Sequence, residues 1–191
     1  MTVDLETGTR GRTRRAILDA AVRVLAADPG ASLGQIADAA DVGRTTLHRY
    51  FPERGDLLAA VSEEAGTRLA AVADRARLDD GPGLDAILRA CQECLRLGDL
   101  LTLVFTGLVP LEQCDPADGF THALDAACTR GLADGSLDTR LTAAWVQTTV
   151  WASLYAAWSE LAQGTAGPHD VVTQLLLTVG KGLAAPGAPA R

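Results

Sequence analysis

The chain has 191 residues, of which 48% are hydrophobic and only 4% are aromatic. This length fits a single domain or a small module joined to a larger one, and the apolar content is sufficient for a buried core. The apolar residues are mainly alanine, leucine and valine, and no segment alternates apolar and polar residues as a half-buried strand does. The composition therefore favours an all-α fold and disfavours folds built on sheets.

The formal net charge is −7, which taken alone argues against binding to nucleic acid. The charge is unevenly distributed, however. Positions 8 to 54 hold eight arginines and five acidic residues, whereas the chain from position 55 onward holds nine basic and seventeen acidic residues. A basic segment followed by an acidic remainder can meet phosphate at one end and stay soluble at the other.

The sequence indicates neither a membrane span nor a secretory route. No stretch reaches the roughly 18 consecutive apolar residues that a membrane span requires. The first ten residues, MTVDLETGTR, contain no apolar core of a signal peptide. We therefore expect a cytoplasmic protein without a membrane partner, whose four cysteines are reduced.

Three short helices are predicted at the start of the chain. Each has apolar residues at the period of one buried helix face. Each is bounded by residues that stop or cap helices: Asp28-Pro29-Gly30 after the first, Ser32 before the second and Pro52 after the third. The helices cover approximately residues 10–27, 32–40 and 44–50. They define a first domain over residues 10–55, preceded by a tail over residues 1–9 that we expect to be disordered.

Longer helices are predicted for the remainder of the chain. They cover approximately residues 56–78, 84–97, 99–113, 117–132, 141–163 and 171–183. The clearest linker is the sequence DDGPG at residues 79–83. These helices define a second, larger domain over residues 56–184, followed by a tail over residues 185–191 that we expect to be flexible.

The second and third helices have the pattern of two short helices that meet at a tight turn. Ala37 is small where the helices must approach, and Ile36, Val42 and Leu47 are apolar where the interface needs side chains. The turn requires a residue that tolerates a positive φ. Asp41 is one of the few residues other than glycine that does so at little cost. The pattern predicts a helix-turn-helix.

The third helix has side chains suited to a DNA recognition helix. Arg44, Thr45, Thr46, His48 and Arg49 place short or cationic donors on it. Arginine can pair with guanine through two hydrogen bonds, and threonine can bond a base edge or touch the methyl group of thymine. Such a helix fits the major groove of DNA.

This stretch resembles the DNA-binding domain of the TetR family of transcriptional regulators. The family pattern is found here as IADAADVG over residues 36–43 and TLHRYF over residues 46–51, followed by Arg54 and Leu57. Both the residue types and their spacing agree in this first part of the chain. The remainder agrees in its length and in its helical pattern.

Three positions depart from the family pattern. Asp41 replaces the usual turn glycine, and Gly43 replaces the usual capping serine, which weakens the cap only slightly. His48 stands where the family usually has a tyrosine that contacts phosphate, and Tyr50 stands where it often has histidine. A donor is kept at both places, and either residue can be the one that touches phosphate.

The resemblance implies a homodimer that binds a palindromic operator in double-stranded DNA. It further implies regulation of transcription, usually repression, that ends when a small apolar effector binds the second domain. The last two helices are implied to form the dimer interface, with the apolar stripe of the final helix covered by the partner. The implied DNA contacts lie at the start of the first helix, in the helix-turn-helix and at the start of the fourth helix: Arg10, Arg12, Arg14, Ser32, Arg44, Thr45, Thr46, His48, Arg49, Tyr50 and Arg54.

Four aromatic residues, Trp145, Trp151, Tyr155 and Trp158, lie close together in the most apolar predicted helix. They can serve as core and dimer interface, where aromatic residues are enriched, or they can line an effector cavity. A cavity of this kind also contains a few polar groups. The candidate effector-binding residues are Cys91, Cys94, Thr102, Phe105, Thr106, Gln113, Gln147, Trp151 and Tyr155.

Cys91 and Cys94 form a C-x-x-C pair, but the pair lies within a helical pattern. A zinc site would need two more ligands at short spacing, whereas Cys114 and Cys128 stand alone. We expect buried free thiols, with a redox switch as the alternative. We expect neither a metal site nor a cofactor.

The sequence offers little for catalysis. His48, His122 and His169 are scattered, no glycine-rich phosphate loop follows a strand, and no Ser-His-Asp set can be placed. We expect a regulator and not an enzyme. Two alternatives stay open: a DNA-binding protein without a small-molecule ligand, and an all-helical enzyme with an apolar pocket.

Overall fold

The structure is a computed structural model that describes residues 8–110 and 119–187. Within these ranges the chain is helical, and the β pairing there is limited to one isolated bridge between Leu137 and Ala184. This confirms the predicted all-α fold. The helices are α1 (Thr9–Ala27), α2 (Leu33–Ala39), α3 (Arg44–Tyr50), α4 (Arg54–Ala76), α5 (Gly83–Leu95), α6 (Asp99–Phe105), α8 (Phe120–Asp134), α9 (Ala143–Gln163) and α10 (Pro168–Leu183).

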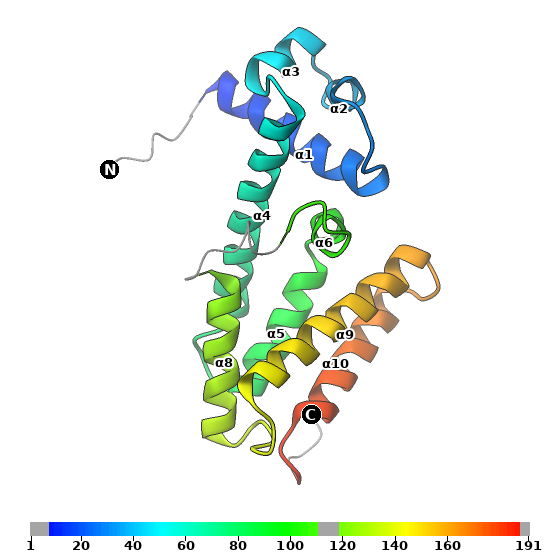
Figure 1. Ribbon diagram of the computed structural model, residues 1–191. Coiled ribbons are helices and arrows are strands. Elements are labelled where there is room, and N and C mark those ends of the chain that lie inside the picture. Colours follow the sequence, from blue (N-terminus) through cyan, green and yellow to red (C-terminus); the bar gives the residue numbers. More distant parts are fainter. Residues whose placement is uncertain (1–7, 111–118, 188–191) are drawn as a thin grey trace, which may run out of the picture.

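The helices form two groups joined by α4 (Figure 1). Helices α1, α2 and α3 gather at one end, and α5, α8, α9 and α10 pack together at the other. Helix α4 leaves the first group and runs along α5 and α8 of the second. The short helix α6 belongs to the second part of the sequence, yet it packs against α1. It is therefore a second contact between the two groups.

The predicted helix-turn-helix is confirmed in its details. The Ser32 hydroxyl accepts a 3.3 Å hydrogen bond from the backbone N–H of Gln35, while the Gln35 side chain accepts one of 2.8 Å from the backbone N–H of Ser32. This reciprocal capping box fixes the start of α2. Asp41 has a φ of 54°, the positive value that the turn requires. Gly43 caps α3 without a side-chain bond.

The predicted helix over residues 99–113 is too long. Helix α6 ends at Phe105, because Gly107 adopts a φ of 75° that right-handed helices do not allow. At this helix end the Thr102 carbonyl accepts two hydrogen bonds from Thr106, one of 2.9 Å from its backbone N–H and one of 2.8 Å from its hydroxyl. Gln113, a predicted effector-binding residue, and Cys114 lie outside the described residues.

The link between α4 and α5 is held by two arginines. Arg89 donates to the carbonyls of Ala76, Arg77 and Asp80, and Arg130 donates to those of Leu78 and Gly81. These bonds satisfy carbonyl groups at and after the C-terminus of α4. The predicted linker is thus a fixed corner and not a loose connection.

Helices α5 and α8 touch through their glycines. A Cβ placed on Gly83 would lie 2.3 Å from the Cα of Gly131, closer than any side chain allows. Glycine at position 83 is therefore required for this contact, whereas a Cβ on Gly131 would mainly meet the Leu137 side chain, 2.6 Å away.

The apolar stripe of α10 is covered by its own chain. Val171, Leu175, Val179 and Leu183 are all buried within the core of a single subunit. For these four residues the expectation that a partner covers the stripe is wrong, because α9 and α5 already pack against α10. Leu176, the fifth residue of the predicted stripe, is half-buried.

Candidate functional site

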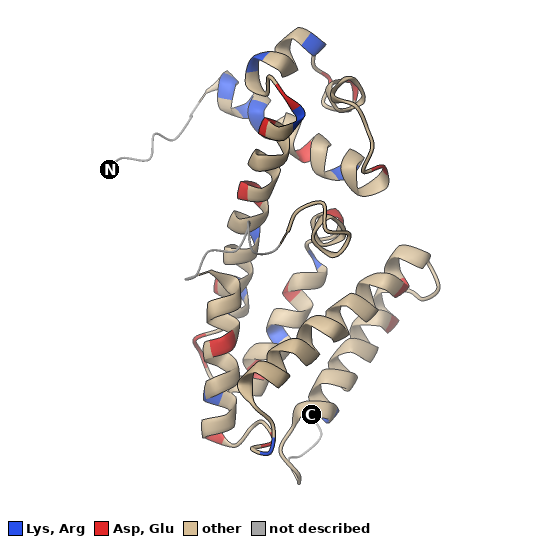
Figure 2. Cartoon of the chain, in the orientation of Figure 1, with Lys and Arg blue, Asp and Glu red and all other residues tan. Residues whose placement is uncertain are grey.

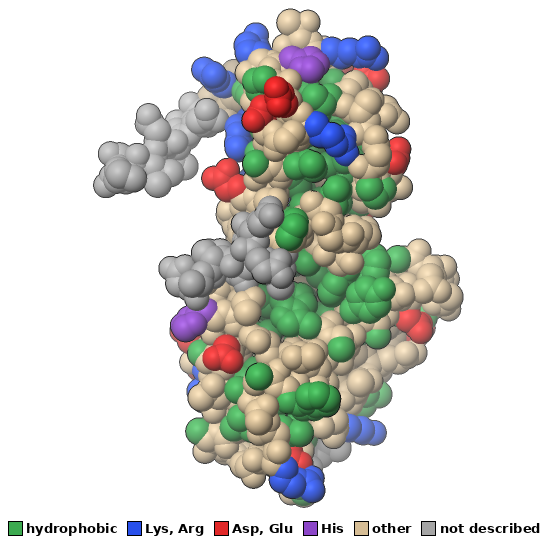
Figure 3. Space-filling view, viewed as in Figure 1, with side chains coloured by type: hydrophobic (Ala, Val, Ile, Leu, Met, Phe, Trp, Pro, Cys, Tyr) green, Lys and Arg blue, Asp and Glu red, His purple; other side chains and the backbone are tan. Residues whose placement is uncertain are grey.

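The first feature of interest is the end of the molecule formed by α1 and α3, where basic side chains gather (Figures 2 and 3). Leu47 is fully buried and anchors α3 on the core, so that the opposite side of the helix faces solvent. The exposed side chains there are Arg44, Thr45, His48 and Arg49, with Thr46 half-buried. The structure thus brings the predicted recognition residues together on one surface.

Arg44 lies close to α2. A Cβ on Gly34 would be only 3.2 Å from Nε of Arg44. The guanidinium therefore rests where glycine leaves room, at the junction of the two helices of the motif.

Tyr50 joins the end of α3 to the start of α1. Its hydroxyl donates a 3.3 Å hydrogen bond to the backbone carbonyl of Arg10. The guanidinium carbons of Arg10 and Arg49 lie 6.0 Å and 5.7 Å from the centre of its ring. At this distance, cations are attracted to an aromatic face. His48 is placed differently: its Nδ1 lies 3.2 Å from the Pro52 carbonyl.

Other predicted DNA contacts are engaged within the chain. Arg54 donates to the carbonyls of Ala31 and Pro29, between α1 and α2. Arg14 lies over the ring of Phe51, 5.9 Å from its centre, and pairs with Glu63 at 3.7 Å.

Two further predicted DNA contacts also have partners within the chain. The Ser32 hydroxyl caps α2, as described above, and Arg12 donates to the Thr9 hydroxyl at 3.2 Å. Of these side chains, Ser32 and Arg12 stay exposed while Arg14 and Arg54 are half-buried.

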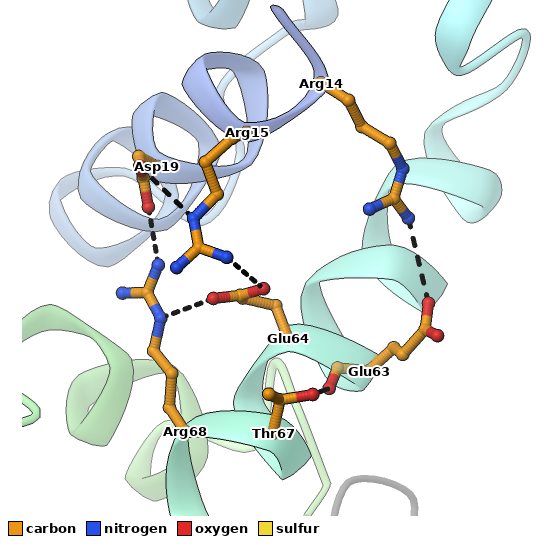
Figure 4. A network of polar contacts seen from close by, with 7 residues as sticks. All are labelled: Arg14, Arg15, Asp19, Glu63, Glu64, Thr67 and Arg68. Atoms are coloured by element: carbon orange, nitrogen blue, oxygen red, sulfur yellow. Dashed lines mark hydrogen bonds and ion pairs between the residues drawn. The ribbon is translucent and has the colours of Figure 1, made fainter. Parts of the chain in front are cut away.

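An ion-pair network joins α1 to α4 (Figure 4). Glu64 of α4 accepts from Arg68 at 2.7 Å and from Arg15 at 3.3 Å, and Arg68 also reaches Asp19 at 2.5 Å. Glu64 is only 8% exposed. Burial alone would lower the pKa of Arg68, but its hydrogen bonds to Glu64 and Asp19 raise the pKa above its ordinary value. The network fixes the direction in which α4 leaves the α1–α3 group.

The second feature of interest is a cluster of aromatic rings between α6, α8 and α9. The Phe105 ring lies 5.3 Å from that of Tyr155, 5.5 Å from that of Trp158 and 6.2 Å from that of Trp151. Trp151 in turn lies 5.8 Å from Phe120. We call these five residues the aromatic cluster. Tyr155 is 50% exposed, so the cluster reaches the surface, where apolar side chains gather over α6 and α9 (Figure 3).

Polar groups border the aromatic cluster. The Trp158 indole N–H donates a 2.9 Å hydrogen bond to the Thr102 hydroxyl and so connects α9 to α6. The Gln147 side chain donates to the Thr121 carbonyl at 3.1 Å. Thr106, another predicted effector residue, is exposed and bonds only to backbone carbonyls. The predicted residues Thr102, Phe105, Trp151 and Tyr155 are therefore brought together.

The described cysteines are buried free thiols, as predicted. Burial raises the pKa of the Cys91 thiol and of the Cys128 thiol to about 12, and it raises that of Cys94 as well. A thiol with so high a pKa is a poor nucleophile, which disfavours a redox switch at these positions. No group of three metal-ligating side chains occurs among the residues that the structure describes.

Comparison with known proteins settles the family. The family model described as "Bacterial regulatory proteins, tetR family" matches residues 17–61. The transcriptional repressor LfrR of Mycolicibacterium smegmatis is 36% identical over 181 residues, which cover 94% of each chain. The chain belongs to the TetR family. The transcriptional repressor KstR of the same organism is 27% identical over 154 residues, which cover 76% of each chain.

Solved structures extend the comparison to the whole fold of this TetR-family chain. LfrR from Mycobacterium smegmatis in complex with proflavine superposes with a TM-score of 0.74 at 35% identity, covering 92% of this chain and 98% of that one. The protein is accordingly a transcriptional regulator and not an enzyme, since its relatives are named transcriptional repressors. No helix in the described part of the chain is long and apolar enough to cross a membrane.

Some site residues of this TetR-family regulator were missed by sequence reasoning. Trp158 was weighed with the other aromatic residues of its helix but not chosen as an effector-binding residue, although it follows Trp151 and Tyr155 at helical spacing that places all three on one face. Phe120 was missed because it comes from a different helix. The Glu64 network was missed for the same reason, since its partners are far apart in the sequence.

Proposed function

We propose that the protein is a homodimeric repressor that releases a palindromic operator when a flat aromatic molecule binds at the aromatic cluster. Residues 10–55 are the DNA-reading domain and residues 56–184 the effector and dimerisation domain. The observation that carries the proposal is the position of α6, which packs against α1 and also holds Phe105 and Thr102 of the effector region. The regulator acts in the cytoplasm, where its DNA is.

The proposed DNA contact is made by α3. In a dimer, the two copies of α3 enter successive major grooves, about 34 Å apart. Arg44 and Thr45 are exposed at the start of this helix and read base edges. Arg10 and Arg49 bind backbone phosphates, because both are exposed and arginine matches phosphate geometry. Arg54 is not a proposed DNA contact, because its donors already meet backbone carbonyls.

The effector class follows from the aromatic cluster and from the proflavine bound to LfrR. Proflavine is a flat, fused-ring aromatic molecule, and such molecules stack on aromatic side chains. Phe105 already stands nearly perpendicular to Trp151 and Tyr155 and in contact with both. An effector must therefore separate these rings to enter, and Phe105 carries the resulting movement into α6.

The movement of α6 reaches DNA through α1. Because α6 packs against α1, and α1 is joined to α3 through Tyr50, a shift of α6 changes the position of α3 relative to its partner copy. The protein then has two conformations that differ in the position of α6. Only an effector that binds these two conformations with different affinity can shift the balance between them.

The proposed dimer interface uses the outer faces of α9 and α10. Residues 143–159 of α9 carry no charge, as Figure 2 also shows. Trp145 is 61% exposed and Leu177 of α10 is 48% exposed. Large apolar side chains on the surface of two adjacent helices favour an isologous two-fold contact.

Two experiments test the proposed function. Selection from a random DNA pool should yield a palindrome, and Arg44→Ala should weaken binding to it by about 1–3 kcal/mol while relaxing base preference. Proflavine should raise the melting temperature of the protein in the absence of DNA. Failure to select any sequence would contradict the proposed DNA-binding regulator. A selected palindrome together with no change of melting temperature by flat aromatic molecules would favour a DNA-binding protein without a ligand.

A further inference from the structure

We infer that Arg10, Tyr50 and Arg49 form a preassembled clamp for one phosphate of the DNA backbone, in which Tyr50 is the positioning residue. The inference rests on the DNA binding proposed above. It assigns the phosphate contact to the two arginines and gives Tyr50 the role of holding them.

The first observation is that both guanidinium groups meet on one ring. They lie 6.0 Å and 5.7 Å from its centre, although Arg10 comes from the first turn of α1 and Arg49 from the last turn of α3. Neither has a carboxylate within ion-pair distance in the described part of the chain. Arg14, Arg15 and Arg68, by contrast, are all paired with acidic residues. Arg10 and Arg49 therefore keep their charge available for an external anion.

The second observation is a cleft between α1 and α3. Its volume is about 430 Å³, and its lining consists of the two arginines, the tyrosine ring and three threonines. No acidic side chain lines it. Guanidinium and hydroxyl groups suit a phosphodiester, whose oxygens accept several hydrogen bonds. The lining residues are Thr9, Arg10, Thr13, Thr46, Arg49 and Tyr50.

The third observation concerns the hydroxyl of Tyr50. It donates to the Arg10 carbonyl at 3.3 Å, so it is directed to the α1 backbone. This bond fixes the start of α1 against the end of α3. Because the ring also restrains both arginine side chains, less side-chain freedom is lost when phosphate binds. Tyr50, which stands where the family often has histidine, thus acts by holding the two arginines and not by touching phosphate itself.

The number of phosphates can be counted from the salt dependence of binding. Each phosphate neutralised contributes about 0.9 to the slope of log K against log salt concentration. If both arginines share one phosphate, the double variant Arg10→Ala/Arg49→Ala should lower the slope by about 0.9 per subunit. A decrease of about 1.8 per subunit would mean two separate phosphates, and no decrease would mean no contact; either result overturns the clamp.

The role of Tyr50 is tested by coupling to Arg10. Tyr50→Leu should weaken DNA binding roughly five- to twentyfold. Adding Arg10→Ala to this variant should weaken binding little further, because Arg10 has already lost the aromatic ring that holds it. Tyr50→Phe, which keeps the ring, should weaken binding less. Arg12→Ala is the matched control, since Arg12 is exposed on the same helix turn but bonds to Thr9, and its effect should be independent of Tyr50.

Binding is measured by fluorescence anisotropy with labelled duplexes of random sequence and of selected sequence, and melting curves verify that each variant is folded. Effects of Tyr50→Leu and Arg10→Ala that multiply within about a factor of two would overturn the positioning role. If Tyr50→Leu does not fold, the slope of the arginine double variant still decides. Since phosphate contacts do not depend on sequence, random DNA tests the clamp even if no operator is selected.

Discussion

The indole N–H of Trp158 donates a 2.9 Å hydrogen bond to the hydroxyl of Thr102 across the contact of α9 with α6. Both side chains are half-buried, and Trp158 also packs against Phe105 and Tyr155. The bond therefore lies between the aromatic cluster and the helix that touches α1. A ligand that displaces Trp158 would break it and free α6.

Replacing Thr102 by valine should lower the free energy of unfolding by roughly 1 kcal/mol, because the indole N–H is left without its partner in a partly buried site. It should also weaken operator binding without any effector, since α6 loses one restraint. Thr106→Val is the control: the same change four residues later removes bonds to backbone carbonyls only. Equal effects of the two variants on operator affinity would show that the Trp158 bond has no part in positioning α6.

Glu64→Gln should destabilise the protein by about 1 kcal/mol, as measured by denaturant unfolding. The nearly buried carboxylate holds two guanidinium groups, and its removal leaves Arg15 and Arg68 with Asp19 alone. The effect is limited because Arg15 is largely exposed. Glu63→Gln removes a solvent-exposed carboxylate with one weak pair and should change stability little. A loss at Glu63 as large as that at Glu64 would contradict this ranking.

Leu177→Glu should give a folded monomer, detected by light scattering at micromolar concentration. Leu177 is half-exposed, so a charge there disturbs a subunit contact more than the core. Leu176 packs partly against the core, and Leu176→Glu should lower the melting temperature as well. Leu177→Ala should stay dimeric. A Leu177→Glu variant that remains a dimer and binds operator normally would place the interface on other helices.

Stability should decrease as the pH rises above about 9. The Cys91 thiol has an ordinary pKa of 9.0 in the unfolded chain, whereas burial raises its pKa to about 12 in the folded protein. Between these values the unfolded state binds fewer protons, so each pH unit should cost about 1.4 kcal/mol per buried thiol. The melting temperature between pH 8 and 10.5 measures this, and Cys91→Ala should flatten the decrease. An identical pH dependence in the variant would mean that other groups cause it.

The helix-turn-helix could be predicted from sequence because its determinants are local. Ser32 caps α2 and Asp41 takes the positive φ, each within a few residues of the helix that it bounds. The end of α6 was misplaced, since glycine adopts left-handed and right-handed conformations with similar ease and the sequence does not show which one Gly107 takes. The stripe of α10 was recognised, but its partner was not, because periodicity shows that a face is buried and not what covers it.

The candidate site was predictable to a similar degree. Exposure of Arg44, Thr45 and Arg49 followed from the spacing of Leu47, the buried residue of the same helix. The engagement of Arg54 with Ala31 and of Arg14 with Phe51 did not follow, because each pair joins segments that lie far apart in the sequence. The number of arginines in a segment can be read from the sequence, whereas the fold determines which of them are free to contact DNA.

The most direct test of an effector site at the aromatic cluster is the release of operator by proflavine from wild type and from Tyr155→Leu. Tyr155 is half-exposed at the edge of the aromatic cluster, so its replacement should leave the fold and operator binding intact. Anisotropy of a labelled operator should fall with proflavine for wild type and require a markedly higher concentration for the variant. A flat aromatic dye can also act on DNA itself, which would release both proteins equally. Equal release, or no release of wild type, would contradict an effector site at the aromatic cluster.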